Sequence, residues 1–165
     1  MSSSFQPRFG PAAEEFERYR PDYPPELYDR ILARVPGERR ERAMDLGAGT
    51  GMVARNLISH FHEVIAVEPD AQMAAKIAEL CAGAVIRVVS AEECEQPRET
   101  VDLITIANAM HWMNAERVVA NVIRWLRPEG VLAVFDRPLP KAGAEVDAVT
   151  TEEFRGPWRG YRDPA

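Results

Sequence analysis

Short apolar runs alternate with segments of helical periodicity along most of this chain. The runs are nearly continuous and rich in β-branched residues, which is typical of strands buried on both faces of a parallel sheet. They occupy residues 43–46, 64–67, 84–89, 101–107 and 131–135. The segments between them repeat apolar residues every three or four positions, as one face of a helix does. We therefore predict an α/β fold with a doubly wound, mostly parallel sheet.

Capping residues mark the ends of several predicted helices. Pro24 and Pro25 suit a helix start, where a missing N–H group has no helical partner to lose. Asp70 and Asn114 can each accept backbone N–H groups at the start of a helix, and Pro128 stops the last helix. The residues expected to face the core are, helix by helix, Leu27, Ile31 and Val35; Val53, Leu57 and Phe61; Met73, Ile77 and Leu80; and Val118, Val122, Ile123 and Leu126.

A glycine-rich heptapeptide, Asp45-Leu46-Gly47-Ala48-Gly49-Thr50-Gly51, lies where the first predicted strand turns into a helix. Glycines adopt positive φ without strain and let a ligand approach the backbone closely. The N–H groups at the start of the helix then point toward such a ligand. An acid that ends the next strand, here Glu68, completes the pattern of a nucleoside-cofactor site.

The spacing of the acid and the glycines indicates which cofactor fits. A dinucleotide site has the spacing G-x-G-x-x-G and holds a pyrophosphate on the turn. Here the spacing is D-x-G-x-G-x-G, and the carboxylate of Asp45 would repel a pyrophosphate but would suit an ammonium or sulfonium group. Glu68 is placed to accept hydrogen bonds from ribose hydroxyls. These charges favour S-adenosylmethionine over NAD.

Six ordered segments of the chain carry a resemblance to a known family. They are residues 19–24, 45–51, 67–70, 90–92, 107–112 and 126–130. In these segments the chain resembles the class I S-adenosylmethionine-dependent methyltransferases, and in particular their type-11, trans-aconitate-methyltransferase-like branch. The resemblance implies a Rossmann-like fold and methyl transfer to a small-molecule acceptor.

The resemblance also implies site residues, which the predicted topology places at the carboxyl ends of the strands. The cofactor-binding residues are expected to be Tyr19, Arg20, Asp45, Gly47, Ala48, Gly49, Thr50, Gly51, Glu68, Pro69, Ala91, Glu92 and Asn108. His111 and Trp112 are expected to face the substrate. No catalytic residue is assigned, because methyl transfer from a sulfonium depends mainly on holding donor and acceptor in line.

Several of these roles have alternatives that the sequence leaves open. Asp45 either meets the methionine amino group, directly or through water, or caps the N–H groups of its own turn. Met73 flanks the adenine or packs in the core, and Glu92 borders the adenine or belongs to a solvated acidic pair. His111 either moves a proton or is a structural histidine beside Trp112.

Composition narrows the class of protein further. The 165 residues are 46% hydrophobic and 28% charged, which is ordinary for one globular domain. A net charge of −6 argues against nucleic acid or an anionic membrane as the main partner. No apolar stretch reaches the ~18 residues needed to span a bilayer. Cys81 and Cys94 lack metal-ligand spacing, so we expect no metal and a reduced, cytoplasmic setting.

The family's sheet has seven strands in the order 3-2-1-4-5-7-6, whereas this chain shows five runs, predicting the order 3-2-1-4-5 with strands 6 and 7 missing. We expect an irregular N-terminal lid segment at 1–22, the methyltransferase domain at 23–136 and an irregular or partly helical tail at 137–165. The fifth run would then be an exposed apolar edge, which a homodimer contact through residues 131–135 or the tail is expected to cover.

Three hypotheses of function follow from the sequence. The first is an active small-molecule methyltransferase. The second is a cofactor-binding but inactive, shortened methyltransferase-like protein or partner subunit, and the third is a nicotinamide oxidoreductase.

Overall fold

The structure of this chain is a computed structural model that describes residues 13–37 and 40–137. The chain divides into two compact units, Met1–Phe135 and Asp136–Ala165. In the second unit only Asp136 and Arg137 are described, so the predicted tail lies almost wholly outside the described residues.

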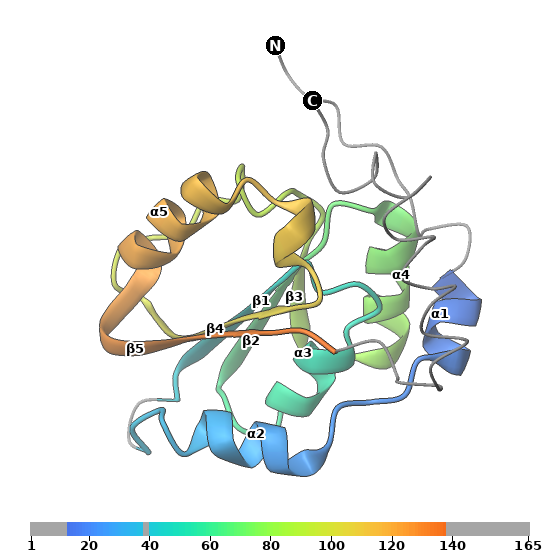
Figure 1. The fold of residues 1–165 in the computed structure, drawn as a ribbon, viewed down its shortest axis with the longest axis horizontal. Coiled ribbons are helices and arrows are strands. Elements are labelled where there is room, and N and C mark those ends of the chain that lie inside the picture. The colour runs from blue at the N-terminus through green and yellow to red at the C-terminus, as the bar shows by residue number, and fades with distance from the viewer. Residues whose placement is uncertain (1–12, 38–39, 138–165) are drawn as a thin grey trace, which may run out of the picture. The chain divides into compact units, whose positions relative to one another are not determined.

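The sheet has five strands, and every pair of neighbours is parallel (Figure 1). The strands are β1 (Arg42–Leu46), β2 (Glu63–Val67), β3 (Ala84–Arg87), β4 (Val101–Ala107) and β5 (Leu126–Phe135). Their order across the sheet is β3-β2-β1-β4-β5, which confirms the predicted order. The direction in which successive strands are added reverses between β1 and β4.

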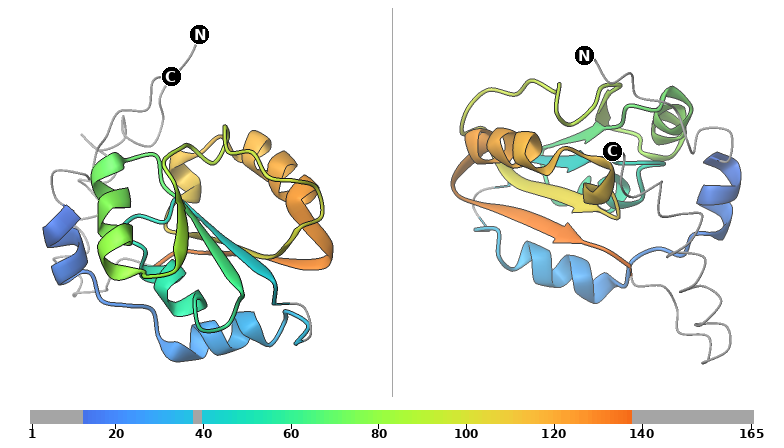
Figure 2. Two further views of the ribbon diagram at one scale, coloured as in Figure 1. Left: turned by 180° about the vertical axis from the view of Figure 1, so that it is seen from behind. Right: turned by 45° about the horizontal axis from the view of Figure 1, so that its top comes forward.

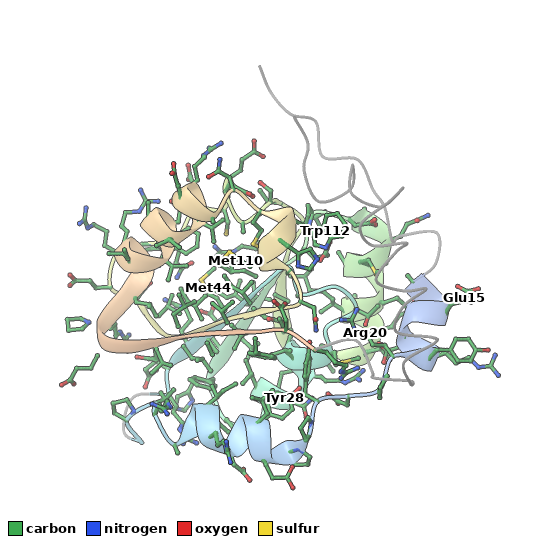
Figure 3. The ribbon with its side chains drawn as sticks, viewed as in Figure 1. Glu15, Arg20, Tyr28, Met44, Met110 and Trp112 are labelled. Carbon is green, nitrogen blue, oxygen red and sulfur yellow. The ribbon has the colours of Figure 1, made fainter. Side chains whose placement is uncertain are left out.

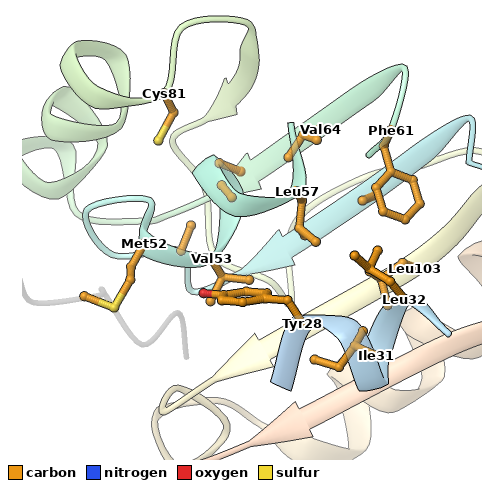
Figure 4. Close-up of a cluster of buried hydrophobic side chains, with 14 of the residues drawn as sticks. Tyr28, Ile31, Leu32, Met52, Val53, Leu57, Phe61, Val64, Cys81 and Leu103 are labelled. Atoms are coloured by element: carbon orange, nitrogen blue, oxygen red, sulfur yellow. The ribbon is translucent and has the colours of Figure 1, made fainter. Parts of the chain in front are cut away.

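Helices cover both faces of the sheet, because alternate residues of each strand point to opposite faces. On one face Ala43 and Leu103 belong to a core shared with α2 (Pro25–Leu32) and α3 (Met52–Leu57), shown in Figure 4. On the other face their neighbours Met44 and Ile104 belong to a core shared with α5 (Ala115–Trp125). Figure 2 shows α5 and α2 on opposite sides of the sheet.

The predicted caps are confirmed at two helices. Oδ1 of Asp70 accepts hydrogen bonds from the N–H groups of Gln72 (2.9 Å) and Met73 (3.3 Å) at the start of α4 (Ala71–Leu80). The Asn114 side chain accepts from the Arg117 N–H at 3.0 Å at the start of α5. These bonds satisfy donors that a helix cannot pair internally, so short side chains decide where each helix begins.

Three expectations from the sequence are wrong. Residues 13–19 form a helix, α1 (Ala13–Tyr19), within the segment predicted to be irregular. Ile123 is 72% exposed, because α5 buries Val118, Val122 and Trp125 and its apolar stripe is centred on those residues. Leu80, the last residue of α4, is 43% exposed for a similar reason, since the core contact of that helix ends at Ile77 and Cys81.

The strand β5 begins directly after α5 and is longer than the predicted run. Val101 of β4 pairs with Leu126 and Leu103 with Val131, so β5 contains an irregular insertion between these two pairs. Within the described residues β4 is the only strand that pairs with β5. Leu132 and Val134 of β5 are 36% and 46% exposed. No helix in the described ranges is long and apolar enough to cross a lipid bilayer.

The turn between β1 and α3 is packed tightly against α4. Gly51 precedes α3 at φ 88°, and a Cβ built on it would lie 2.5 Å from Sγ of Cys81. Gly83 also has positive φ, 100°, but has nothing within 4 Å of such a Cβ. A side chain at Gly83 would therefore add backbone strain alone, whereas a side chain at Gly51 would add both strain and steric overlap.

We expect Gly51→Ala to lower the free energy of unfolding by about 2–4 kcal/mol, because it adds overlap to strain. Gly83→Ala, which adds strain alone, should cost about 1 kcal/mol. Adding Cys81→Ala to the Gly51 variant should recover part of the loss. Urea denaturation measures all three, and a Gly51 variant as stable as the Gly83 variant would contradict the packing.

Candidate functional site

The carboxyl ends of the strands meet at one rim of the sheet, and backbone hydrogen bonds join the segments that leave them. The Gly47 N–H donates to the Val67 carbonyl at 2.9 Å. The Glu68 N–H donates to the Arg87 carbonyl at 3.0 Å. Ligands of open α/β sheets bind at such a rim, where strand order reverses. The structure thus gathers the segments that the sequence singled out after β1, β2 and β4.

The glycine turn after β1 (residues 47–51) has an unusual backbone. Its three glycines, Gly47, Gly49 and Gly51, have φ of 69°, 60° and 88°. A Cβ built on Gly47 would lie 2.7 Å from Cβ of Ala109, so the segment after β4 lies directly on the turn. Thr50 is 1% exposed and Ala48 is 8% exposed. Backbone, and not side chains, therefore forms most of the surface that this turn offers.

Glu68 connects the glycine turn to the turn after β2. Its Oε2 accepts the Gly49 N–H at 2.8 Å, and its Oε1 accepts the Asp70 N–H at 2.9 Å. Burial raises the pKa of this carboxyl, although the two amides oppose the shift. Each oxygen retains a second acceptor position, so the carboxylate can still bind two hydroxyls of a ligand. Pro69 follows it and is partly buried.

Asp45 lies beneath the turn and is only 1% exposed. Its Oδ1 accepts a hydrogen bond from Oγ1 of Thr105 at 2.8 Å, and in the described part of the chain its buried Oδ2 has no hydrogen-bond partner. Burial raises the pKa of Asp45 to about 7, against the lowering effect of Thr105. Because Asp45 is buried, its effect on a ligand would pass through water or through the turn and not through direct contact.

The N-terminal segment brings a second set of predicted residues. Tyr19 ends α1 and is 70% exposed, with the Arg18 guanidinium 5.4 Å from its ring centroid. Arg20 follows on the linker to α2 and is partly buried (Figure 3). The Tyr19 ring is therefore largely in solvent, while Arg20 lies closer to the body of the domain.

Asn108 and Tyr23 form a contact that the sequence did not predict. Asn108 has φ 50° directly after β4, and its Nδ2 donates to the hydroxyl of Tyr23. The Tyr23 ring packs edge to face on Phe135 at the end of β5, with 5.0 Å between centroids. The linker before α2 is thereby joined to the ends of both β4 and β5. The only signal was that Tyr23 belongs to the segment 19–24.

His111 and Trp112 lie on a short 3-10 helix, η2 (Met110–Trp112), that follows β4 (Figure 3). Both residues are exposed, and their ring centroids are 4.9 Å apart at 50°. They follow Asn108 beyond the carboxyl end of β4, and their role toward a substrate stays a prediction. The structure thus brings an imidazole and an indole together after this strand.

Glu92 and Ala91 form the turn after β3. Oε1 of Glu92 accepts the Asn114 N–H at 2.6 Å, and Nδ2 of Asn121 donates to the carbonyls of Ala91 (3.3 Å) and Glu92 (3.2 Å). Ala91 is buried. One carboxylate oxygen of Glu92 is thus used to fix the start of α5.

Residues that could hold a metal ion do not cluster in the described ranges. Cys81 and Cys94 are buried and free.

Comparisons with known proteins agree with this geometry. A profile of methyltransferase domains matches residues 44–134, which is more than half of the chain. A provisionally named methyltransferase of Dictyostelium discoideum is 34% identical over 151 residues, covering 92% of this chain and 57% of the relative. The chain spans about half the length of the curated relatives that it matches.

Solved structures show the same fold. A provisionally named type II methyltransferase from Anaeromyxobacter dehalogenans is 32% identical with a TM-score of 0.66, covering 84% of this chain and 57% of that one. Phosphoethanolamine N-methyltransferase 1 of Haemonchus contortus, in complex with phosphoethanolamine and S-adenosylhomocysteine, is 19% identical with a TM-score of 0.59. That comparison covers 82% of this chain and 33% of the other, and it shows the fold alone.

Asp45 should make stability depend on pH. In the folded chain the Asp45 carboxyl keeps its proton up to about pH 7, whereas in an unfolded chain it loses the proton near pH 4. The protonated Asp45 carboxyl therefore makes its full contribution to the free energy of unfolding below about pH 4, and this contribution is lost as the pH rises to about 7. The side chain in Asp45→Asn stays neutral at every pH. The free energy of unfolding of this variant should therefore rise relative to that of the wild type by about 1–3 kcal/mol between pH 5 and pH 8.

Chemical denaturation at the two pH values checks this expectation. Asp29→Asn, at an exposed position of α2, is the matched control and should differ from the wild type by the same amount at both. If the Asp45 variant also kept a constant difference, the buried carboxyl would not titrate in this range.

Proposed function

This chain belongs to the S-adenosylmethionine-dependent methyltransferase family, and from that premise we propose that it moves a methyl group from S-adenosylmethionine to a small-molecule acceptor. The observation that carries the proposal is the rim where the glycine turn, the Glu68 carboxylate and the buried Asp45 meet. A nucleoside that also bears a positive charge suits this combination of groups.

The residues present fit the cofactor's two ends. Glu68 has acceptor positions left for the ribose hydroxyls, and the glycine turn offers backbone without side chains in the way. Asp45 lies buried beneath the turn, and a positively charged group near it would favour the carboxylate over the protonated form. A pyrophosphate at the same place would face two carboxylates.

When bound, the cofactor supplies an electrophilic methyl group on sulfur and leaves as a neutral thioether. The chain's own contribution is position, because holding two reacting atoms in line is worth several kcal/mol. The Asn108–Tyr23 contact fixes the segment after β4, and η2 places His111 and Trp112 beside it. These residues form the side of the rim that is left for an acceptor.

Proton removal depends on the acceptor. A carboxylate needs none, whereas a hydroxyl or a protonated amine needs a base within hydrogen-bond reach. His111 is exposed on the rim and is our candidate for that base.

The test is calorimetry on the full chain with S-adenosylmethionine, S-adenosylhomocysteine and NAD, followed by mass spectrometry of a metabolite extract for methylated product. We expect the first two ligands to bind and NAD not to bind. Glu68→Ala should weaken cofactor binding by about 1–3 kcal/mol through lost hydrogen bonds. Glu95→Ala, at an exposed position, is the control and should bind normally.

Each outcome bears on the proposal. Binding without any methylated product would support a cofactor-binding partner subunit instead of an enzyme. Heat with NAD alone would support an oxidoreductase. An unchanged affinity of the Glu68 variant would remove the ribose role.

We also propose that the outer edge of β5 joins two copies of the chain. That edge has no strand partner in the described sheet, and Leu132 and Val134 beside it are exposed. A strand edge is complementary to a second copy of itself, so pairing extends the sheet and covers the apolar side chains.

Sedimentation across a dilution series should show a dimer that Leu132→Lys converts to a monomer, because the charge would be buried at the contact. Leu80→Lys, at an exposed apolar position on α4, is the control and should stay dimeric. A monomeric wild type in which the β5 amides that point away from β4 exchange slowly would show that another part of the same chain covers the edge instead. Fast exchange in a monomer would leave the edge open.

A further inference from the structure

Arg55 lies between two carboxylates that come from outside its own helix. It sits in α3, four residues after the glycine turn, and its Nη1 is 2.5 Å from Oε1 of Glu17 in α1. Its Nη2 is 3.6 Å from Oδ2 of Asp22, on the linker to α2. The side chains of Arg55 and Glu17 are 28% and 22% exposed, so this pair is more shielded than a surface ion pair. We call these three side chains the Arg55 clamp.

The clamp reaches the glycine turn itself. The second oxygen of Glu17, Oε2, accepts a hydrogen bond from Oγ1 of Thr50 at 2.5 Å. Thr50 belongs to the turn and is buried. One carboxylate thus holds α1 against the turn and against the helix that follows it.

The Asp22 end of the clamp is fixed independently. Its Oδ1 accepts from the Tyr28 hydroxyl at 3.1 Å, and its Oδ2 accepts from Nδ2 of Asn56 at 3.2 Å. Nδ2 of Asn56 also donates to the Met52 carbonyl at 2.8 Å. The segment between the two anchors, residues 18–21, is therefore held at both ends by contacts to α3.

The contacts described for the side chains of α1 are mostly charged. Among its described side chains only Ala13 is buried. A further ion pair, from Glu14 to Lys76 of α4, spans 3.5 Å with Glu14 83% exposed. A segment held mainly by charged contacts opens locally far more readily than a core element.

We propose that Arg55 is a positioning residue that keeps residues 17–22 on the glycine turn, and that breaking its pair with Glu17 opens the site for exchange of the cofactor. The identity of the ligand rests on the proposed function, whereas the statement that the Arg55–Glu17 pair holds α1 does not. Cofactor release then proceeds through an opening of α1 whose rate the clamp sets.

The first test measures the dissociation rate of S-adenosylhomocysteine by stopped-flow displacement. We expect Arg55→Gln and Glu17→Gln each to raise it about three- to thirtyfold, as loss of a charge-assisted contact should. The rate increase in the double variant should be smaller than the product of the two single increases, because both substitutions remove the Arg55–Glu17 pair. Arg55→Lys should fall between, and Arg30→Gln, an exposed arginine of α2, should match the wild type.

The dependence of the dissociation rate on salt distinguishes loss of the ion pair from a general loss of stability. The wild-type dissociation rate should rise with ionic strength, because salt screens the pair, and that of Arg55→Gln should rise less, because of the ion pairs described for α1 only the exposed Glu14–Lys76 pair is left to screen. Additive effects of the two substitutions, or equal salt dependence in both proteins, would overturn the proposal.

The second test needs no cofactor. Hydrogen exchange of the ligand-free protein should be faster in Arg55→Gln at the amides of residues 13–22 and unchanged in β1 and β4. If the wild type bound no cofactor, the proposed function would fail while this measurement still decided whether the clamp holds α1. Unchanged exchange in residues 13–22 would overturn the clamp.

Discussion

The Glu68 carboxylate is the contact on which the geometry of the rim depends. Its two oxygens accept N–H groups from Gly49 and Asp70, which belong to turns after different strands. Asp70 in turn caps α4 through its own side chain. One buried acid therefore fixes the glycine turn relative to β2 and α4, and it does so while both oxygens keep an acceptor position. A cofactor that uses those positions meets a site already in place.

Two buried carboxylates at one turn are costly without a cation. Glu68 raises the pKa of Asp45, although burial is the larger cause, and the Thr105 hydroxyl compensates in part. A ligand that brings positive charge removes some of this cost, whereas a ligand that brings phosphate increases it. On the proposed function, the burial of Asp45 would therefore favour a cationic cofactor without any direct contact between the two.

The sheet order, the caps at Asp70 and Asn114 and the gathering of the strand-end segments were predictable, because each follows from local pattern or from the parallel topology. The contacts that tune the site were not. Thr105 meets Asp45 because the two residues pair in register between β4 and β1, and no pattern in the sequence states that register.

The helix α1 and its clamp escaped prediction for a related reason. Glu17 and Arg55 are separated by 38 positions, and each alone reads as an ordinary surface charge. The sequence pattern also did not show which residues near the end of α5 face the core. Trp125 is fully buried there, whereas Ile123, which was expected to face the core, is exposed. Roles for the individual site residues stay predictions.

The two sides of the rim differ in how they are built, and this difference bears on specificity. The side that we propose for the cofactor consists of backbone and of two buried acids, Glu68, which accepts two backbone N–H groups, and Asp45, which accepts the Thr105 hydroxyl, so substitutions there disturb the fold as well as the site. The side that we propose for the acceptor presents His111 and Trp112 as exposed residues of η2, whose Met110 packs against the core. Substitutions at exposed positions generally cost less stability than substitutions of buried residues, because less packing is lost. On the proposed function, the exposed side of the rim is therefore where a change of acceptor would cost the fold least.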